Sequence, residues 1–122
     1  MKKILIIDDD EDFLEWVALG LSREKYEIFT AESGKAGLKL IEIQEPCVAI
    51  IDVYLPDMNG FEICRQIKNG KNSQNTSVIL VTGVFKDVDA IDKGYQNGAD
   101  DFLIKPFSYE QLRIRVLRQI RK

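Results

Sequence analysis

The sequence predicts an α/β fold: a doubly wound sheet of five parallel strands, in the order 2-1-3-4-5, with five helices. Short apolar runs alternate five times with amphipathic stretches along the 122 residues. This alternation is typical of a parallel sheet covered on both faces, because right-handed crossovers return each strand to the same sheet. Several runs are continuously apolar rather than alternating in polarity, which indicates strands buried on both faces.

The expected elements of the first half are two strands and two helices, at 3–7, 27–31, 11–23 and 34–44. Four consecutive apolar residues, at 4–7, define the first strand. The helix after it places Phe13, Val17 and Leu21 on one stripe, as an amphipathic helix does. The second strand and helix continue the alternation, and a helix between two strands implies that these strands are parallel.

The expected elements of the second half are three strands and three helices, at 47–52, 77–82, 101–104, 60–69, 86–97 and 107–121. Each strand contains three or four consecutive apolar residues. Asn59 and Gly60 precede the third helix and Gly98 follows the fourth, where such residues punctuate elements. The last helix places Leu112 and Val116 on its apolar stripe.

The composition is that of one globular domain, which we expect to span 1–122 around a single core. Hydrophobic residues make up 45% and charged residues 30% of the chain, and no apolar span has the length of a membrane helix or signal-peptide core. We therefore expect a cytoplasmic location without membrane contact. Cys47 and Cys64 lack the spacing of a zinc site, which favours buried free thiols.

The chain contains no histidine. Ser-His and Cys-His catalysis, histidine-ligated metals and phosphohistidine chemistry are therefore excluded within this chain. Neither a Gly-x-Gly-x-x-Gly motif nor a Walker A loop is present, and this argues against nucleotide binding.

Charge is distributed unevenly along the chain. The net charge is −3, with 13 acidic and 6 basic residues in 1–60 but 7 acidic and 11 basic residues in 61–122. The last expected helix carries five cations, at Arg113, Arg115, Arg118, Arg121 and Lys122. A basic helix could contact nucleic acid. We prefer a solvated face with cations near a helix C-terminus, and expect no direct nucleic-acid binding by this domain.

An unbroken acidic block, 8–12, follows the first strand. Ligands bind at the carboxyl ends of strands in open α/β sheets, so Asp8 and Asp9 are delivered to the edge where chemistry occurs. Clustered carboxylates repel one another unless a cation joins them, and a hard divalent metal, Mg²⁺, fits oxygen ligands best. Capping of the following helix is the alternative role for these aspartates.

Three further polar residues end strands of the predicted sheet: Asp52, Thr82 and Lys105. In the predicted order 2-1-3-4-5, the three strands that carry them lie side by side with the first strand. Their side chains should therefore meet Asp8 and Asp9 at one edge of the sheet. Phosphoryl transfer to a carboxylate needs such parts: a metal, an ammonium group and an in-line nucleophile. Each residue also has an ordinary alternative, as a turn cap, a strand residue or a surface lysine.

Four segments carry motifs, at 7–11 (Ile-Asp-Asp-Asp-Glu), 51–60 (Ile-Asp-Val-Tyr-Leu-Pro-Asp-Met-Asn-Gly), 81–83 (Val-Thr-Gly) and 98–107 (Gly-Ala-Asp-Asp-Phe-Leu-Ile-Lys-Pro-Phe). With them the whole chain resembles the receiver domain of bacterial two-component response regulators, which have a flavodoxin-like fold. Leu55 and Asn59 depart mildly from the family, which often has Met and Asp there. The small residue that the family requires beside the phosphoryl group is matched by Gly83.

The resemblance implies a role for each site residue. Asp52 would be the phosphoacceptor, and it would bind Mg²⁺ together with Asp8, Asp9 and the backbone carbonyl of Tyr54. Thr82 would be the switch hydroxyl and Lys105 the phosphate-binding cation. Phe102 would be the switch aromatic, moving into the space that Thr82 vacates.

The function implied is a phosphorylation-controlled switch. A sensor histidine kinase or phosphotransfer protein would donate the phosphoryl group, and an output domain or effector protein would respond. The domain would then be no enzyme on other substrates, since it would catalyse only its own phosphorylation and dephosphorylation. Two alternatives are an aspartate-dependent phosphatase, although Asp52 lacks the second acid of an Asp-x-Asp motif, and an interaction module that is not phosphorylated.

Two finer expectations concern assembly and timing. Near its end the chain resembles the winged-helix DNA-binding regulators, which dimerise through the face expected here at 86–121. Asp100, Asp101 and Arg115 fit that dimer, whereas Ile91 and Gln111 replace an expected base and acid.

By resemblance, Tyr54 and Val84 flank the approach of the hydrolytic water. Neither offers a carboxylate or amide to orient it, so we expect slow self-dephosphorylation.

Overall fold

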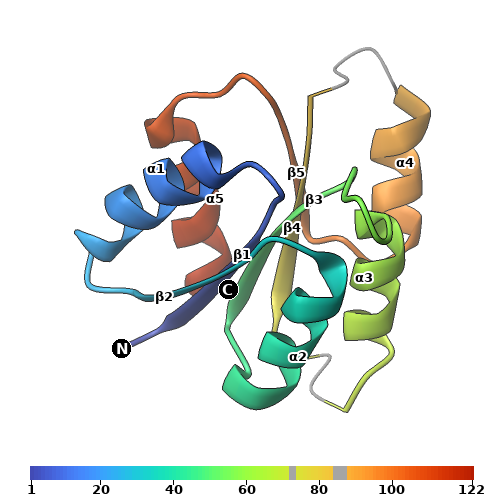
Figure 1. Cartoon of the computed structure of the whole chain (residues 1–122), viewed down its shortest axis with the longest axis horizontal. Coiled ribbons are helices and arrows are strands. Elements are labelled where there is room, and N and C mark those ends of the chain that lie inside the picture. Colours follow the sequence, from blue (N-terminus) through green and yellow to red (C-terminus); the bar gives the residue numbers. More distant parts are fainter. Residues whose placement is uncertain (72–73, 84–87) are drawn as a thin grey trace.

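The computed structural model describes residues 1–71, 74–83 and 88–122. Its sheet has five strands: β1 (Lys3–Ile7), β2 (Glu27–Ala31), β3 (Val48–Asp52), β4 (Ser77–Thr82) and β5 (Asp101–Ile104). All neighbouring strands are parallel and their order is β2-β1-β3-β4-β5, as predicted (Figure 1). The α/β doubly wound fold is therefore confirmed.

Helices cover both faces of the sheet. They are α1 (Glu11–Ser22), α2 (Gly34–Gln44), α3 (Gly60–Lys68), α4 (Val88–Gln96) and α5 (Tyr109–Ile120). The helices α1 and α5 lie on one face, and α2, α3 and α4 lie on the other (Figure 1). The sheet therefore forms the middle of three layers, which explains why its central strands are apolar on both sides.

Alternate residues of the central strands enter two separate core layers. On β1, Ile4 and Ile6 pack with residues of α1 and α5, whereas Leu5 and Ile7 pack on the opposite side. Cys64 is buried and Cys47 is half-buried, and both are free thiols. The burial expected for Cys47 is thus incomplete. Within the described residues, no helix combines the length and apolar character needed to cross a bilayer.

Element boundaries differ from the expectations by one or two residues. The last helix begins at Tyr109 rather than at 107, because Ser108 forms a capping box with Gln111. The Ser108 hydroxyl accepts a hydrogen bond from the Gln111 amide at 3.1 Å, and the Ser108 amide donates to the Gln111 side chain at 2.9 Å. Part of the helix expected at 86–97 lies outside the described residues.

The register aligns the carboxyl ends of the strands that carry the predicted site. Asp52 of β3 lies beside Val81 of β4, and Thr82 lies beside Ile104 of β5. The chain leaves β1 at Ile7, beside Ile51. The polar residues after β1, β3 and β5 are therefore delivered to one edge of the sheet, where doubly wound folds bind ligands.

Candidate functional site

The acidic block after β1 divides between two roles. Asp10 is the N-cap of α1, and its carboxylate accepts hydrogen bonds from the amides of Asp12 and Phe13 at 3.0 and 3.3 Å. Asp8 and Asp9 instead join Asp52. The capping interpretation of the sequence is thus confirmed for Asp10, and Asp8 and Asp9 remain available for the predicted metal.

The three carboxylates of Asp8, Asp9 and Asp52 form the candidate metal centre. One oxygen from each residue lies within 4.8 Å of the other two. Asp8 is buried, Asp52 is half-buried and Asp9 is exposed, so the cluster opens to solvent on one side. An all-oxygen, partly hydrated donor set suits Mg²⁺, which keeps several of its waters when bound to protein carboxylates.

The environment of Asp52 disfavours its charged form in the absence of a cation. The pKa of Asp52 is raised to about 6, mainly by burial and also by the nearby carboxylates of Asp8 and Asp9, whereas the hydrogen bond from Tyr54 and the charge of Lys105 act in the opposite direction. The Tyr54 amide donates to Asp52 Oδ1 at 3.1 Å. A divalent cation would relieve this repulsion, and the cluster therefore fits the predicted metal.

Lys105 brings the predicted cation to the carboxylates. Its Nζ lies 2.9 Å from Asp8 Oδ2 and 3.8 Å from Asp52 Oδ2. Its backbone amide donates to the carbonyl of Thr82 at 2.7 Å, which attaches the end of β5 to that of β4. The bond to Pro106 is cis. The structure thus unites Lys105 with the residues that sequence reasoning grouped with it.

Thr82 and Gly83 end β4 beside this cluster. The Thr82 side chain is buried, with 1% of the residue exposed. A Cβ atom added to Gly83 would meet no heavy atom within 4 Å. Within the described residues, no neighbouring atom requires glycine at this position, and the expected need for a small residue beside a phosphoryl group stays a prediction.

Phe102 occupies a different position from the one expected before phosphorylation. The residue is only 6% exposed, and its ring packs in the core next to Gly94. A Cβ on Gly94 would lie 3.0 Å from this ring, so glycine allows the close packing. The inward movement expected for Phe102 is therefore unnecessary in this conformation, because the ring is already inside.

The loop that follows Asp52 is held at several points. The Gly60 amide donates to the Val53 carbonyl at 2.7 Å, and a Cβ on Gly60 would lie 2.5 Å from the Asp52 carbonyl oxygen, so only glycine fits there. The two carboxylate oxygens of Asp57 accept from the amides of Gly34 and Lys35, each at 2.9 Å. The loop is thereby fixed to both α3 and α2.

Tyr54 lies in this loop, forms an isolated bridge with Asn59 and is 52% exposed. Its backbone carbonyl as a metal ligand stays a prediction. Val84, the second residue expected beside the approaching water, lies outside the described part of the chain.

An aromatic cluster beside the site was not predicted as functional. Phe13 of α1, Trp16, Phe107 and Tyr109 form a chain of ring contacts between α1 and the start of α5. The Lys105 ammonium lies over the Phe13 ring, 4.0 Å from its centroid. From the sequence, Phe13 was assigned only to the apolar stripe of the first helix. A further indication lay in the two aromatic pairs, Phe13 with Trp16 and Phe107 with Tyr109, that turn out to pack together.

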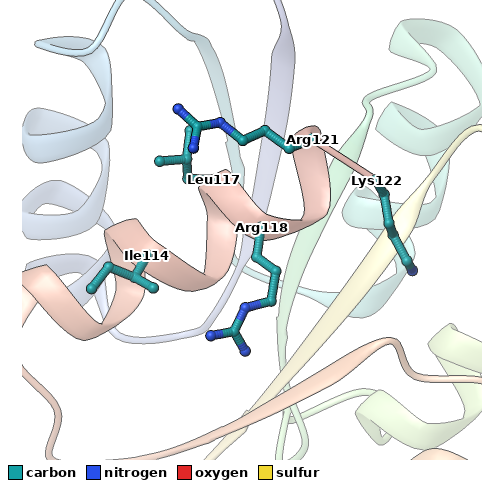
Figure 2. Close-up of a pocket in the computed structure, with 5 residues that line it drawn as sticks. All are labelled: Ile114, Leu117, Arg118, Arg121 and Lys122. Carbon is teal, nitrogen blue, oxygen red and sulfur yellow. The ribbon is translucent and has the colours of Figure 1, made fainter.

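The cations of α5 are partly neutralised within the chain. Arg113 pairs with Glu110 and Glu24, Arg115 with Asp101 and Lys122 with Asp100. Arg118 and Arg121 line a shallow pocket on the outer face of α5 together with Ile114, Leu117 and Lys122. Figure 2 shows Arg118 and Arg121 extending in different directions from the helix. This dispersal favours the solvated-face interpretation over a continuous basic stripe.

Comparison with known proteins agrees with this geometry. The family model for the response regulator receiver domain matches residues 4–117. The transcriptional regulatory protein AfsQ1 of Streptomyces coelicolor is 35% identical over 122 residues, which cover 100% of this chain and 52% of that protein. The chain spans about half the length of the curated relatives it matches.

Solved structures are similar over nearly the whole chain. The chemotaxis response regulator CheY4 of Vibrio cholerae has a TM-score of 0.90 at 28% identity, with 98% of each chain covered. The BeF3-activated DrrB receiver domain has a TM-score of 0.88 at 37% identity, with 100% of this chain and 99% of that chain covered.

A five-stranded doubly wound sheet with three carboxylates and a lysine at its carboxyl edge defines a phosphoacceptor signalling domain. The chain belongs to the response regulator receiver domain family of two-component signal transduction. Receiver domains bind Mg²⁺ at an acidic pocket, and the carboxylates of Asp8, Asp9 and Asp52 form a cluster that could hold a metal ion.

Proposed function

We propose that Asp52 accepts a phosphoryl group in a Mg²⁺-dependent reaction and that the resulting aspartyl-phosphate switches the conformation of the domain. One arrangement carries this proposal. The carboxylate of Asp52 lies within 4.8 Å of those of Asp8 and Asp9, and 3.8 Å from the ammonium of Lys105. A nucleophilic carboxylate, metal-binding acids and a cation are the components that phosphoryl transfer requires.

The donor is phosphohistidine on a sensor histidine kinase or a phosphotransfer protein. These 122 residues contain no histidine, so the donor imidazole lies outside them. An oxygen of Asp52 attacks the phosphorus atom, the P–N bond breaks, and the imidazole leaves with its electron pair and takes up a proton. Lys105 is close enough to bind an oxygen of the transferred group. Asp8, Asp9, Asp52 and the Tyr54 carbonyl would hold Mg²⁺. The bound ion would supply positive charge to the oxygens of the transferred group.

The switch acts through Thr82 and Phe102. The Thr82 hydroxyl binds the new phosphoryl group, and this contact raises the population of the conformation in which Phe102 lies inside, the position that its ring has in this structure. A bias of a few kcal/mol between two conformations suffices for such a switch. The domain catalyses only its own phosphorylation and dephosphorylation. Turnover of phosphate esters would support the phosphatase alternative instead.

The output lies in a further domain or an effector protein. Relatives named transcriptional regulators are about twice as long as this chain, and this supports an output segment whose activity the receiver controls. The receiver itself, under this proposal, does not contact nucleic acid. Its cytoplasmic location and its extent as one domain over 1–122 stay predictions.

A homodimer through the 86–121 face is one assembly open to this domain. Here Asp101 binds Arg115 at 2.6 Å and Asp100 binds Lys122 at 2.8 Å within one chain. Gln111, which replaces an acid of that interface, is occupied in the α5 capping box. The dimer would therefore need these internal ion pairs to exchange for pairs between chains.

Intact-mass measurement tests the acceptor. The protein is incubated with a small-molecule phosphodonor and Mg²⁺, and we expect the mass of one phosphoryl group on wild type and none on Asp52→Asn. Asp10→Asn is the matched control, since asparagine also caps helices and Asp10 is outside the carboxylate cluster. Equal labelling of wild type and Asp52→Asn would exclude Asp52 as the acceptor.

Magnesium titration tests the metal centre. Asp9→Asn should weaken Mg²⁺ binding by at least about tenfold, because a carboxylate ligand becomes a neutral amide. Asp12→Asn makes the same charge change on the first turn of α1, outside the cluster, and should leave the affinity within about twofold. Unchanged affinity in Asp9→Asn would remove Asp9 from the ligand set.

A further inference from the structure

The ammonium of Lys105 has a third neighbour besides two carboxylates. Its Nζ lies 4.0 Å from the centroid of the Phe13 ring. Cations over an aromatic face within about 6 Å are attracted to the negative potential of the ring. A lysine has four rotatable bonds, so each such contact narrows the positions that its ammonium can occupy.

The Phe13 ring is itself fixed. Phe107 meets it edge to face, with centroids 5.9 Å apart and an interplanar angle of 88°, and Trp16 lies 6.1 Å away. The backbone amide of Phe13 is bound by the N-cap Asp10. Lys105 and Phe107 are close in sequence and both contact the same ring, so the segment after β5 is held against α1 on both sides of Pro106.

An aromatic face holds a cation without neutralising it. Asp8 also binds Lys105, at 2.9 Å, but a carboxylate draws the ammonium toward the metal ligands. Phe13 carries no net charge, so its contact with Lys105 does not reduce the positive charge that an incoming phosphoryl group on Asp52 would meet. The ring thus restricts the position of the ammonium while leaving its charge free to act.

We propose that Phe13 is a positioning residue for phosphoryl transfer, which orients the Lys105 ammonium toward Asp52 through its ring face. This rests on the proposed function of Asp52 as the acceptor. Phe13→Leu keeps an apolar side chain on the stripe of α1 but removes the ring. It should slow phosphorylation by a saturating small-molecule donor by about three- to tenfold, and leave Mg²⁺ affinity unchanged.

Matched variants separate positioning from packing. Phe13→Tyr keeps the ring face and should retain the wild-type rate within about twofold. Phe29→Leu makes the same substitution on β2, at a partly buried position that packs on the opposite core layer. It should lower stability without slowing phosphorylation. If Phe29→Leu slowed phosphorylation as much as Phe13→Leu, the slower rate would come from lost stability, and the proposal would be overturned.

Fluorinated phenylalanines at position 13 give the sharpest test, since they change the potential of the ring while keeping its shape. One, two and three fluorines should lower the phosphorylation rate progressively, with the thermal unfolding midpoint nearly constant. A rate independent of fluorination would overturn the positioning role. Absence of labelling in wild type would instead refute the acceptor assignment, so the two proposals fail by different results.

Discussion

The ammonium of Lys105 lies closer to Asp8 than to Asp52, at 2.9 Å against 3.8 Å. Asp8 is 1% exposed, and a buried carboxylate is costly unless it is paired. The lysine therefore neutralises a buried carboxylate of the candidate metal centre. To bind a phosphoryl oxygen on Asp52, it would have to give up part of this interaction, and it would compete with a metal ion for Asp8.

Replacing Lys105 should have opposite effects on metal binding and on phosphorylation. In Lys105→Met we expect Mg²⁺ affinity to rise by about three- to tenfold, because the buried charge of Asp8 loses its competing cation. Phosphorylation should slow by at least about tenfold, because the transferred group loses a cation. Mg²⁺ titration and intact-mass kinetics measure the two effects. The control is Lys39→Met, which removes an exposed lysine of α2 and should change neither quantity. Weaker Mg²⁺ binding in Lys105→Met than in wild type would contradict competition between Lys105 and the metal.

The contribution of Asp52 to stability without metal should fall as pH rises. The pKa of Asp52 is raised by burial to about 6, above its value of about 4 in an unfolded chain, so the folded state binds more protons between these values. The contribution of Asp52 to the free energy of unfolding therefore decreases from about pH 4 to pH 6 and then stays constant.

Asp52→Asn should remove this dependence. At pH 7 the variant should be more stable than wild type by about 1–2 kcal/mol, and the two should converge toward pH 4. Urea unfolding without Mg²⁺ across this range is the measurement. Mg²⁺ affinity of wild type should also fall below about pH 6, because protons compete for Asp52. Parallel stability curves for the two proteins would show that Asp52 does not titrate there.

Gly94→Ala should disturb Phe102. The added Cβ would lie 3.0 Å from both Leu80 Cδ1 and the Phe102 ring, and overpacking should exceed the helix-propensity gain, for a net loss of about 1 kcal/mol. In a Phe102→Leu background the same change should cost less, since the smaller side chain can yield. A double-mutant cycle by urea unfolding measures the coupling. Strict additivity would mean that Phe102 does not limit the space at Gly94.

The lifetime of the aspartyl-phosphate should depend on Tyr54. This residue follows the acceptor by two positions and offers neither a carboxylate nor an amide side chain to orient water. The double variant Tyr54→Asn, Val84→Glu should lose its phosphoryl group about tenfold faster than wild type. Val88→Glu with Tyr95→Asn makes the same changes at exposed positions of α4 and serves as the control. Equal lifetimes for the first variant and wild type would refute the expectation.

The sequence predicts the fold and the grouping of the site because both follow from periodicity. Continuous apolar runs identify the central strands, and the strand order places residues 8, 9, 52 and 105 at one edge, where the structure has them. Such a prediction needs only the direction and order of the strands. It does not require the orientation of any side chain.

The sequence alone does not reveal which aspartate of the acidic block caps the helix, because Asp9 and Asp10 are adjacent residues of the same type. Asp10 is the cap and Asp9 the member of the carboxylate cluster because α1 begins directly after Asp10, whose φ and ψ angles are those of an N-cap. The contact between Phe13 and Lys105 was equally inaccessible. It joins residues far apart in sequence, and its distance is decided by the packing of Phe13 on Phe107.

The loop after Asp52 is anchored to two neighbouring helices. The Asp57 carboxylate binds the start of α2, and the Gly60 amide at the start of α3 binds the Val53 carbonyl. On the other side, the backbone bond from Lys105 to Thr82 ties the ends of β5 and β4 together. A phosphoryl group on Asp52 would therefore arrive among main-chain segments already joined by hydrogen bonds, and the adjustment it requires would fall mainly on side chains.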